Sequence, residues 1–278
     1  MKFVIVGANG QLGKVLQDRY PKARAVDRDE LDITDAAAVQ AFDWTGYDVI
    51  LNAAAYTNVD GAQTPEGRQA AWNVNATAVA NLAAAAVAHD LALVHVSSDY
   101  VFDGTKKLHR EDEPLTPLGV YGQAKAGGDL AAGVAPKHYI LRTTWLIGDG
   151  PNFVRAMMSL AAKNISPSVV SDQVGRLTFT DQLADGIVHL LETKAPYGTY
   201  NLTGDGEPAS WADITREIFR DLGRDDLTVT DQTTADYFKD KPEAAPRPAW
   251  SIMDLSKIQA TGFQLHNWRD DLKRYLSN

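Results

Sequence analysis

Phe3-Val-Ile-Val6 runs directly into Gly7-Ala-Asn-Gly10-Gln-Leu-Gly13, and this stretch decides the fold. The four apolar residues predict a buried β-strand, because a short apolar run rich in β-branched side chains is typical of a strand covered on both faces. The apolar residues that follow recur at helical spacing up to Pro21, namely Leu12, Val15, Leu16 and Tyr20. A strand, a glycine loop and a helix in this order form the first unit of a dinucleotide-binding fold.

The glycine loop predicts a binding site for the pyrophosphate of a dinucleotide. Glycines let the backbone turn sharply and approach the pyrophosphate, and the helix N-terminus adds amide donors and a partial positive charge. The spacing is G-x-x-G-x-x-G and not the more common G-x-G-x-x-G, so the evidence lies in the strand and helix on either side. The loop residues assigned to the cofactor are Gly7, Asn9, Gly10, Gln11, Leu12 and Gly13.

Further apolar runs of strand length alternate with helical patterns, and each run ends in small or polar residues. The runs are 23–26, 49–52, 91–98 and 139–143. Strands that alternate with helices predict an α/β fold with a Rossmann-type, doubly wound parallel sheet.

Beyond Gly148 the alternation loosens, which predicts a second domain. Helices are expected near 153–163, 181–192 and 211–222. We expect an NAD(P)-binding Rossmann domain over 1–147, with return segments within 168–203. A smaller, interleaved α/β substrate-binding domain, mainly 148–278, is expected to cover the strand ends.

Asp27-Arg28 ends the second strand and bears on the choice of cofactor. An aspartate accepts hydrogen bonds from a free ribose 2′-hydroxyl and favours NAD, whereas an arginine pairs with a 2′-phosphate and favours NADP. Both cofactors are expected to be accepted, with NADPH preferred.

A helix over 73–89 is expected to bring Asn75 towards a strand end. The other residues expected at the cofactor are Asp32, Ile33, Asn52, Ala53, Ala54, Ala55 and Tyr56.

Tyr121-Gly-Gln-Ala-Lys125 places a tyrosine and a lysine one turn apart on a predicted helix. A free phenol titrates near ~10, so ~4 kcal/mol is needed to bring its pKa to neutrality. A lysine ammonium at ~4 Å supplies about that at an effective dielectric of ~20. Ser98 ends the preceding strand, and ligands of such sheets bind outside the carboxyl ends of the strands. We therefore assign catalysis to Ser98, Tyr121 and Lys125, and expect the last two to contact the cofactor as well.

The composition disfavours several classes of function. The net charge of −9 and the pI of about 5.1 would repel nucleic acid and anionic membranes. The chain has no cysteine, which excludes disulfides and thiolate chemistry, and its 6 histidines show no ligand spacing. The N-terminal apolar run is too short for a signal peptide and no run reaches membrane-spanning length, so we expect a cytoplasmic protein.

Taken together, six motifs resemble the dTDP-4-dehydrorhamnose reductases of the extended short-chain dehydrogenase/reductase superfamily. In order, they are Gly7-x-x-Gly10-x-x-Gly13, Asn52-Ala-Ala-Ala-Tyr-Thr-Asn-Val-Asp60, Ser97-Ser-Asp-Tyr-Val-Phe-Asp-Gly104, Val120-Tyr-Gly-Gln-Ala-Lys125, Arg142-Thr-Thr-Trp145 and Arg247-Pro-x-x-Ser251. The resemblance spans nearly the whole chain. The motif that begins at Ser97 is distinctive for this branch, whereas the glycine loop and Tyr-x-x-x-Lys indicate only the superfamily.

The resemblance implies reduction of dTDP-4-dehydro-β-L-rhamnose to dTDP-L-rhamnose with NADPH or NADH, for cell-surface polysaccharide. It makes Tyr121 the proton donor, Lys125 the group that tunes its pKa and anchors the ribose, and Ser98 their hydroxyl partner. Residues lining the sugar site would be Asp99, Tyr100 and Trp145. Arg247 lies in an irregular, proline-rich stretch where a basic side chain can meet a substrate phosphate.

Two other functions remain open at this stage. One is a reductase or epimerase of another nucleotide sugar. The other is a non-catalytic, NADP-binding regulator, since the regulatory subunit of methionine adenosyltransferase resembles the same branch. The presence of Ser98, Tyr121 and Lys125 favours the enzyme.

The resemblance also raises the question of Mg²⁺. Some members of the family are described as Mg²⁺-dependent dimers with glutamates at the interface, one of them just after the third glycine. Lys14-Val15 stands there in this chain and offers no oxygen ligand, and Glu192 is the only substitute considered. We expect no metal site, and a monomer or weak homodimer.

Replacing Arg28 by alanine tests the cofactor assignment. We expect Arg28→Ala to weaken NADPH binding by about tenfold or somewhat more, because one charged hydrogen bond contributes ~1.5–3 kcal/mol. NADH, which lacks the 2′-phosphate, should lose much less. Titration of both cofactors by fluorescence checks this, and an equal loss for both would show that Arg28 does not meet the phosphate.

Overall fold

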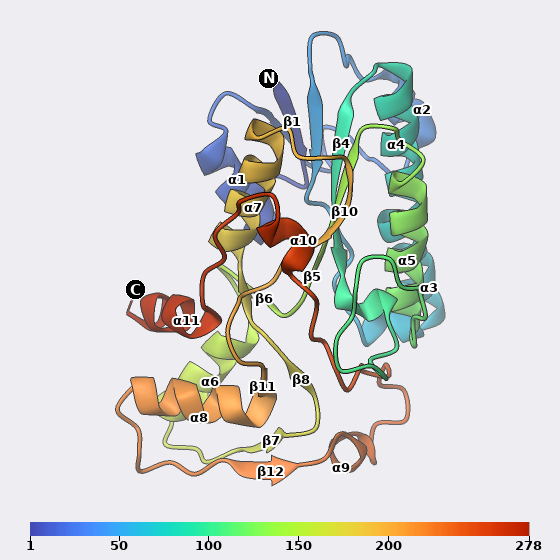
Figure 1. Ribbon diagram of the computed structural model, residues 1–278. Helices are drawn as coiled ribbons and strands as arrows, with labels where there is room; N and C mark the ends of the chain where they lie inside the picture. The colour runs from blue at the N-terminus through green and yellow to red at the C-terminus, as the bar shows by residue number, and fades with distance from the viewer. Residues whose placement is uncertain (278) are drawn as a thin grey trace.

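The structure, a computed structural model that describes residues 1–277, is built on a six-stranded parallel sheet (Figure 1). Its strands are β1 (Phe3–Val6), β2 (Arg24–Val26), β3 (Val49–Asn52), β4 (Ala92–Ser98), β5 (His138–Thr143) and β10 (Gly198–Asn201). Their order across the sheet is β10-β5-β4-β3-β1-β2, and every pair is parallel. The chain winds one way from β1 to β2 and the other way from β3 to β10. The predicted Rossmann-type sheet is confirmed, and its strand order reverses beside β1.

Helices cover both faces of this sheet, which explains why its central strands are mainly apolar. On one face lie α1 (Gln11–Arg19) and α7 (Thr180–Glu192); on the other lie α2 (Ala36–Ala41), α4 (Ala78–Ala88) and α5 (Val120–Ala132). In β1, Phe3 and Ile5 point into the first core and Val4 and Val6 into the second. Alternate side chains leave a strand on opposite faces, so a strand buried on both sides needs an unbroken apolar run.

The helix expected over 73–89 begins earlier. Thr64 Oγ1 accepts from the amide of Gly67 at 3.0 Å, and α3 (Pro65–Trp72) starts at Pro65, a favourable first helical residue. A π-helical turn, η2 (Asn73–Thr77), joins α3 to α4. The turn directs Asn75 at the loop after β3, where its side chain exchanges two 2.9 Å hydrogen bonds with the backbone of Tyr56.

Two residues of N-cap type, Thr34 and Asp35, precede α2, and Thr34 does not cap it. The Asp35 carboxylate caps the helix instead, accepting from the amides of Ala37 and Ala38. The Thr34 side chain turns instead towards Asp32, and its hydroxyl donates to Asp32 Oδ1 at 2.6 Å.

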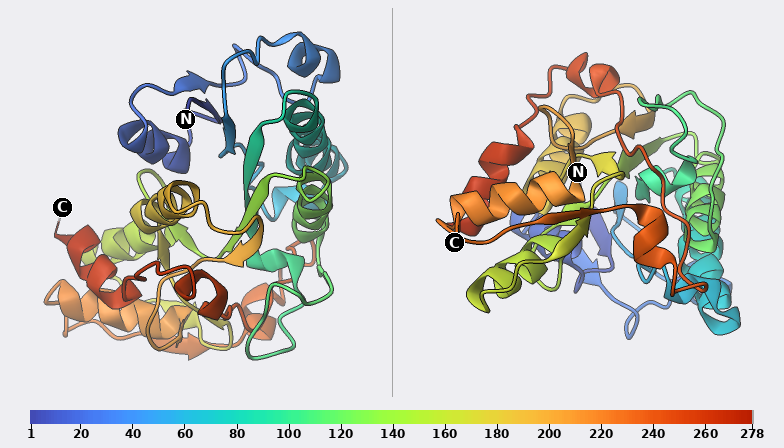
Figure 2. Two further views of the ribbon diagram at one scale, coloured as in Figure 1. Left: turned by 45° about the horizontal axis from the view of Figure 1, so that its top comes forward. Right: turned by 90° about the horizontal axis from the view of Figure 1, so that it is seen from below.

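A second lobe lies beyond the carboxyl ends of the strands (Figure 1, Figure 2). It contains β6 (Leu146–Ile147), α6 (Phe153–Ala162), β7 (Ser168–Val170), β8 (Val174–Gly175), β9 (Thr178–Phe179), β11 (Ala209–Ser210), α8 (Trp211–Asp221), β12 (Thr230–Gln232), α9 (Thr234–Phe238) and α11 (Trp268–Leu276). Its core is separate from those of the large sheet and gathers around Trp268, Phe219 and Val154.

The two lobes are interleaved in sequence. Within 168–203, α7 and β10 return to the large sheet, whereas β7, β8 and β9 stay in the second lobe. Near the C-terminus, α10 (Ser256–Gln259) also packs on the core of the large sheet through Ile258. The division into domains at residue 147 stays a prediction. Over residues 1–277 no helix combines the length and the apolar character needed to cross a bilayer.

Candidate active site

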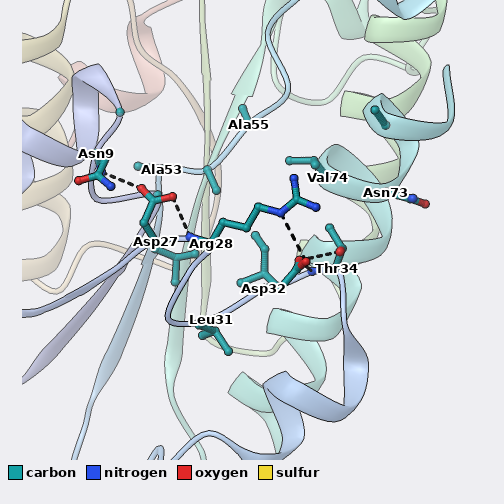
Figure 3. Close-up of a pocket in the computed structure, with 16 residues that line it drawn as sticks. Asn9, Asp27, Arg28, Leu31, Asp32, Thr34, Ala53, Ala55, Asn73 and Val74 are labelled. Atoms are coloured by element: carbon teal, nitrogen blue, oxygen red, sulfur yellow. Dashed lines mark hydrogen bonds and ion pairs between the residues drawn. The ribbon is translucent and has the colours of Figure 1, made fainter. Parts of the chain in front are cut away.

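A cavity of about 540 Å³ lies at the carboxyl ends of β1, β2 and β3 (Figure 3). Ten of the residues assigned to the cofactor line it: Gly7, Asn9, Gly10, Asp27, Arg28, Asp32, Ile33, Ala53, Ala54 and Ala55. The sequence analysis missed Val6, Leu31, Thr34, Ala70, Asn73 and Val74. The last three come from α3 and the π-turn, which carry no cofactor motif, so only the packing of this helix against the strand ends identifies them.

The shape of the loop suits a pyrophosphate. Gly7 has a φ of +77°, and a Cβ on it would lie 2.6 Å from the amide nitrogen of Ala54, so only glycine lets the loop pass so close to β3. A Cβ on Gly13 would lie 2.2 Å from the Gly7 carbonyl oxygen, which presses α1 onto the loop. No side chain caps the N-terminus of α1, leaving the amides of its first turn for an anionic ligand.

Asp27 and Arg28 differ in how they face the cavity. The Asp27 carboxylate accepts from the amides of Asn9 at 2.9 Å and Arg28 at 2.8 Å, so it braces the glycine loop against β2. The Arg28 side chain is 81% exposed and reaches across the cavity mouth, with Nε 3.5 Å from Asp32 Oδ2 (Figure 3). Hydrogen bonds from Thr34 are the main cause that lowers the pKa of Asp32. The exposed guanidinium of Arg28 therefore contacts Asp32 through Nε at the cavity mouth, whereas the Asp27 carboxylate already accepts two amide hydrogen bonds.

Eight residues assigned to the cofactor do not line the cavity, namely Gln11, Leu12, Gly13, Asn52, Tyr56, Asn75, Tyr121 and Lys125. Leu12 is buried in the core of the sheet. Asn52 Oδ1 accepts from the amide of Ala54 at 3.1 Å, which shapes the loop after β3, as Asn75 does through Tyr56. The side chains of Asn52 and Asn75 thus support the loop after β3, part of which lines the cavity.

Ser98, Tyr121 and Lys125 are brought together by the contact of α5 with the end of β4. A Cβ on Gly122 would lie 2.2 Å from the carbonyl oxygen of Tyr100, so the first turn of α5 touches the backbone of η3 (Asp99–Val101). The rings of Tyr100 and Tyr121 meet edge to face with centroids 5.4 Å apart. The Ser98 hydroxyl is close enough to the Tyr121 phenol to lower its pKa.

Lys125 does not lower the pKa of Tyr121 in the structure, so that part of the sequence-based prediction is wrong. Burial and the Asp99 carboxylate raise the pKa of Tyr121 to about 12, and Ser98 only partly opposes them. The Lys125 ammonium donates to the carbonyl oxygen of Val96 at 2.6 Å. Burial lowers the pKa of Lys125 itself to about 8, with Asp129 opposing. The phenol therefore holds its proton at neutral pH, as a proton donor must.

A buried ion pair supports the lysine from behind. Arg142 Nε lies 2.9 Å from Asp129 Oδ2, with both side chains at most 6% exposed. Arg142 also donates to the carbonyl oxygen of Glu111 at 3.0 Å. Asp129 is one helical turn beyond Lys125, a spacing that would have marked it as a partner of the lysine.

The residues assigned to the sugar have different surroundings. Asp99 is 3% exposed and lies between the hydroxyls of Ser98 and Ser251, while Tyr100 packs against Tyr121. Trp145 follows β5 with a φ of +42°, a conformation that is strained for a bulky residue. Its ring stacks on Trp211 at 3.7 Å, an aromatic partner that the sequence analysis missed.

Arg247 is held by the large lobe. Its Nη2 lies 2.9 Å from Asp60 Oδ2, and its Nη1 donates to the carbonyl oxygen of Ala245 at 2.7 Å. It is near enough to Tyr100 to lower the pKa of that phenol, although burial outweighs this and the net pKa is raised. Arg247 thus lies at the active site, where its guanidinium already has an anionic partner.

Metal ligands do not gather anywhere in residues 1–277: no three His, Asp or Glu side chains lie close enough together to hold an ion. Around α1, Lys14 is exposed and Val15 packs against the core of the sheet. Glu192 lies near the buried hydroxyl of Tyr20, whose pKa it raises after the larger effect of burial. Lys14 and Val15 thus offer no oxygen ligand, and the expectation of no metal site stays a prediction.

Comparison with known proteins gives a consistent result. A family model described as RmlD substrate binding domain matches residues 1–278. A dTDP-4-dehydrorhamnose reductase of Aggregatibacter actinomycetemcomitans is 41% identical, over 98% of this chain and 97% of the relative. A probable dTDP-4,6-dihydroxy-2-methyloxan-3-one 4-ketoreductase of Streptomyces antibioticus is 37% identical, over 98% of this chain and 94% of the relative.

Solved structures agree with these relatives. A dTDP-4-dehydrorhamnose reductase from Clostridium acetobutylicum superposes with a TM-score of 0.91 at 37% identity, over 100% of this chain and 99% of that one. The dTDP-4-dehydrorhamnose reductase from Bacillus anthracis, solved in complex with NADP, superposes with a TM-score of 0.88 at 32% identity. The match covers 100% of this chain and 99% of that one.

The buried lysine makes a pH-dependent contribution to stability. The pKa of Lys125 is lowered to about 8 in the folded chain from its ordinary value of 10.5. Between these values the unfolded chain binds more protons, so the free energy of unfolding rises with pH. We expect wild type to gain about 3 kcal/mol relative to Lys125→Met between pH 7 and pH 10.5. Urea unfolding across this range measures the difference.

The matched control is Lys14→Met, which removes an exposed lysine of α1. A constant difference between wild type and Lys125→Met across the range would show that the lysine does not titrate in the interior.

Proposed function

The chain belongs to the family described as RmlD substrate binding domain, and on that basis we propose that it reduces the 4-keto group of dTDP-4-dehydro-β-L-rhamnose to give dTDP-L-rhamnose. It is an NAD(P)-dependent oxidoreductase of the short-chain dehydrogenase/reductase type. The proposal for this substrate is supported mainly by one observation: Ser98, Tyr121 and Lys125 lie together at the end of β4. Asp99 and Tyr100 lie beside them. The product would enter cell-surface polysaccharide, and we assign the reaction to the cytoplasm, as the sequence predicts.

Protonation of the sugar oxygen falls to Tyr121. NADPH, when bound, supplies the hydride that the carbonyl carbon takes up. The oxygen then gains negative charge, and the Tyr121 phenol, with a pKa raised to about 12, still carries the proton to give it. Lys125 adds a buried positive charge one turn away, and the Ser98 hydroxyl adds a polar partner. Groups placed in advance where charge develops stabilise the transition state without reorganising.

NADPH is the proposed cofactor, with NADH accepted less well. The support is local: Asp27 already has two amide donors, whereas the exposed Arg28 guanidinium is available to a 2′-phosphate. The relative from Bacillus anthracis was solved with NADP. The residues that would hold the cofactor are those lining the cavity, with the pyrophosphate at Gly7 and Gly10 before α1. Tyr121 and Lys125 would contact its nicotinamide half.

The two alternative functions, a non-catalytic regulator and an enzyme for another nucleotide sugar, are less well supported by the same observations. A non-catalytic regulator would have no need of a protonated phenol and a buried lysine at the strand end, where their burial costs stability. Another dTDP sugar is the closer alternative, because the Streptomyces antibioticus relative is named as a 4-ketoreductase of a different one.

Replacing Tyr121 by phenylalanine tests the reaction directly. We expect wild type to oxidise NADPH only when a nucleotide 4-keto sugar is present. Tyr121→Phe should lower kcat at least a hundredfold, because a positioned proton donor contributes about 10²–10⁴ in rate. Cofactor affinity should stay near that of wild type. Both points are checked by measuring the loss of NADPH absorbance with a panel of nucleotide keto sugars. Turnover by the Phe variant at the wild-type rate would show that Tyr121 is not the proton donor.

Removing divalent metal tests the assembly. We propose catalysis without Mg²⁺ by a monomer or weak homodimer, because Lys14 and Val15 supply no oxygen ligand. Rate and light-scattering mass should be the same with EDTA and with added Mg²⁺. A several-fold loss of rate, or a halving of mass on chelation, would contradict the proposal.

A further inference from the structure

Asp99 is a buried carboxyl group beside the catalytic hydroxyls, and the reaction described above does not use it. The Ser98 hydroxyl donates to its Oδ1 at 3.0 Å, and the Ser251 hydroxyl lies 2.5 Å from its Oδ2. All three residues are at most 8% exposed. Ser251 comes from the C-terminal segment, which pairs with β8 of the second lobe through Val174. A chain of hydroxyl, carboxyl and hydroxyl thus links the second lobe to the active-site serine.

The hydrogen bonds of Ser98 decide what it offers a substrate. A serine hydroxyl has one hydrogen and two lone pairs. The amide of Tyr100 donates to one lone pair at 3.2 Å, and an ionised Asp99 takes the hydrogen. Only a lone pair then remains, and a lone pair cannot stabilise the carbonyl oxygen of a ketone as it gains negative charge.

A neutral Asp99 reverses the direction of this bond. Ser251 donates into Oδ2, which leaves the acid hydrogen on Oδ1, the oxygen that faces Ser98. The acid then donates to Ser98 Oγ, and the hydrogen of Ser98 is released towards the substrate. We propose that Asp99 is a positioning residue that, as a neutral acid oriented by Ser251, turns the Ser98 hydroxyl into a donor to the sugar carbonyl. This role rests on the proposed reduction.

The surroundings of Asp99 keep the neutral form accessible. Burial raises the pKa of Asp99 to about 6, although Ser251, Ser98 and the nearby His109 lower it. The other titratable groups that interact with it are the phenols of Tyr121, from α5, and Tyr100, from its own helical turn. Both phenols have raised pKa values and are uncharged in this range. The donor form of Ser98 is therefore present below about pH 6 and declines above it.

Asp99→Asn tests the direction of the bond. An asparagine copies the neutral acid, since its amide group can donate to Ser98 while its oxygen accepts from Ser251. With saturating NADPH and keto sugar, we expect the wild-type kcat to fall with pH above about 6, by up to roughly tenfold per pH unit. The Asn variant should show a flat profile from pH 5 to 7.5, whatever fraction of the wild-type maximum it reaches.

Asp112→Asn is the matched control, because it makes the same chemical change at a side chain that is 78% exposed in the nearby loop. It should keep the wild-type profile. A fall in rate with pH that persists in Asp99→Asn would overturn the proposal.

Ser251→Ala provides a second test should Asp99→Asn not fold. Loss of the Ser251 donor removes a contact that favours the ionised carboxylate, so the fall in kcat should move to higher pH. An unchanged midpoint would count against the role of Ser251.

A readout independent of turnover is the ¹³C chemical shift of the Asp99 carboxyl carbon, assigned by its absence in Asp99→Asn. We expect a titration near pH 6 that moves upwards in Ser251→Ala. An Asp99 that stays ionised down to pH 5 would refute the inference even in an active enzyme. Absence of turnover by wild type at every pH would instead refute the proposed function, and the two failures are thus distinguishable.

Discussion

The burial of ionisable side chains at the ends of β4 and β5 is the constraint on which the rest of the structure depends. Lys125, Asp129, Arg142 and Asp99 are each at most 5% exposed. A charge removed from water is tolerated only where it is paired or hydrogen-bonded. Here Lys125 has the Val96 carbonyl oxygen, Arg142 has Asp129, and Asp99 has two hydroxyls. The partners come from β4, α5, β5 and the C-terminal segment, so these elements must meet at one point.

Close backbone contacts allow that meeting. In α5, Gly122 lies against the Tyr100 carbonyl of η3 and Gly128 against the Asn75 carbonyl of η2, each with a hypothetical Cβ at 2.2 Å. Side chains at these positions would push α5 away from η3 and η2 and take Tyr121 and Lys125 with it. A similar close contact occurs at the glycine loop, where Gly13 lets α1 pack directly against the backbone of Gly7. Both halves of the active site are therefore built by helices that touch backbone directly.

The second lobe completes the site from the other side. Its C-terminal segment, residues 245–251, is anchored at one end by Asp60 and at the other by Asp99. Between these anchors Pro248 lies over Gly104, where no Cβ would fit. A segment fixed at both ends to the large lobe places Arg247 and Ser251 beside Tyr100 and Ser98 with little freedom. The candidate substrate site is thus lined from both lobes, by residues that are far apart in sequence.

The sequence by itself determined the sheet, the glycine loop and ten of the residues that line the cavity beside it, and it singled out Ser98, Tyr121 and Lys125, whose catalytic role stays a prediction. These are local signals: apolar runs, glycine spacing and helical periodicity act over a few residues and survive without tertiary context. Only the tertiary structure decided that α3 supplies Ala70 and the π-turn supplies Asn73 and Val74 to the cavity. It likewise decided that Lys125 binds Val96 instead of lowering the pKa of Tyr121. It also decided that Ser251 bonds to Asp99, across 152 residues. The reason is physical, because burial and long-range partners set a pKa and a hydrogen-bond direction, and neither is encoded in the spacing of neighbouring residues.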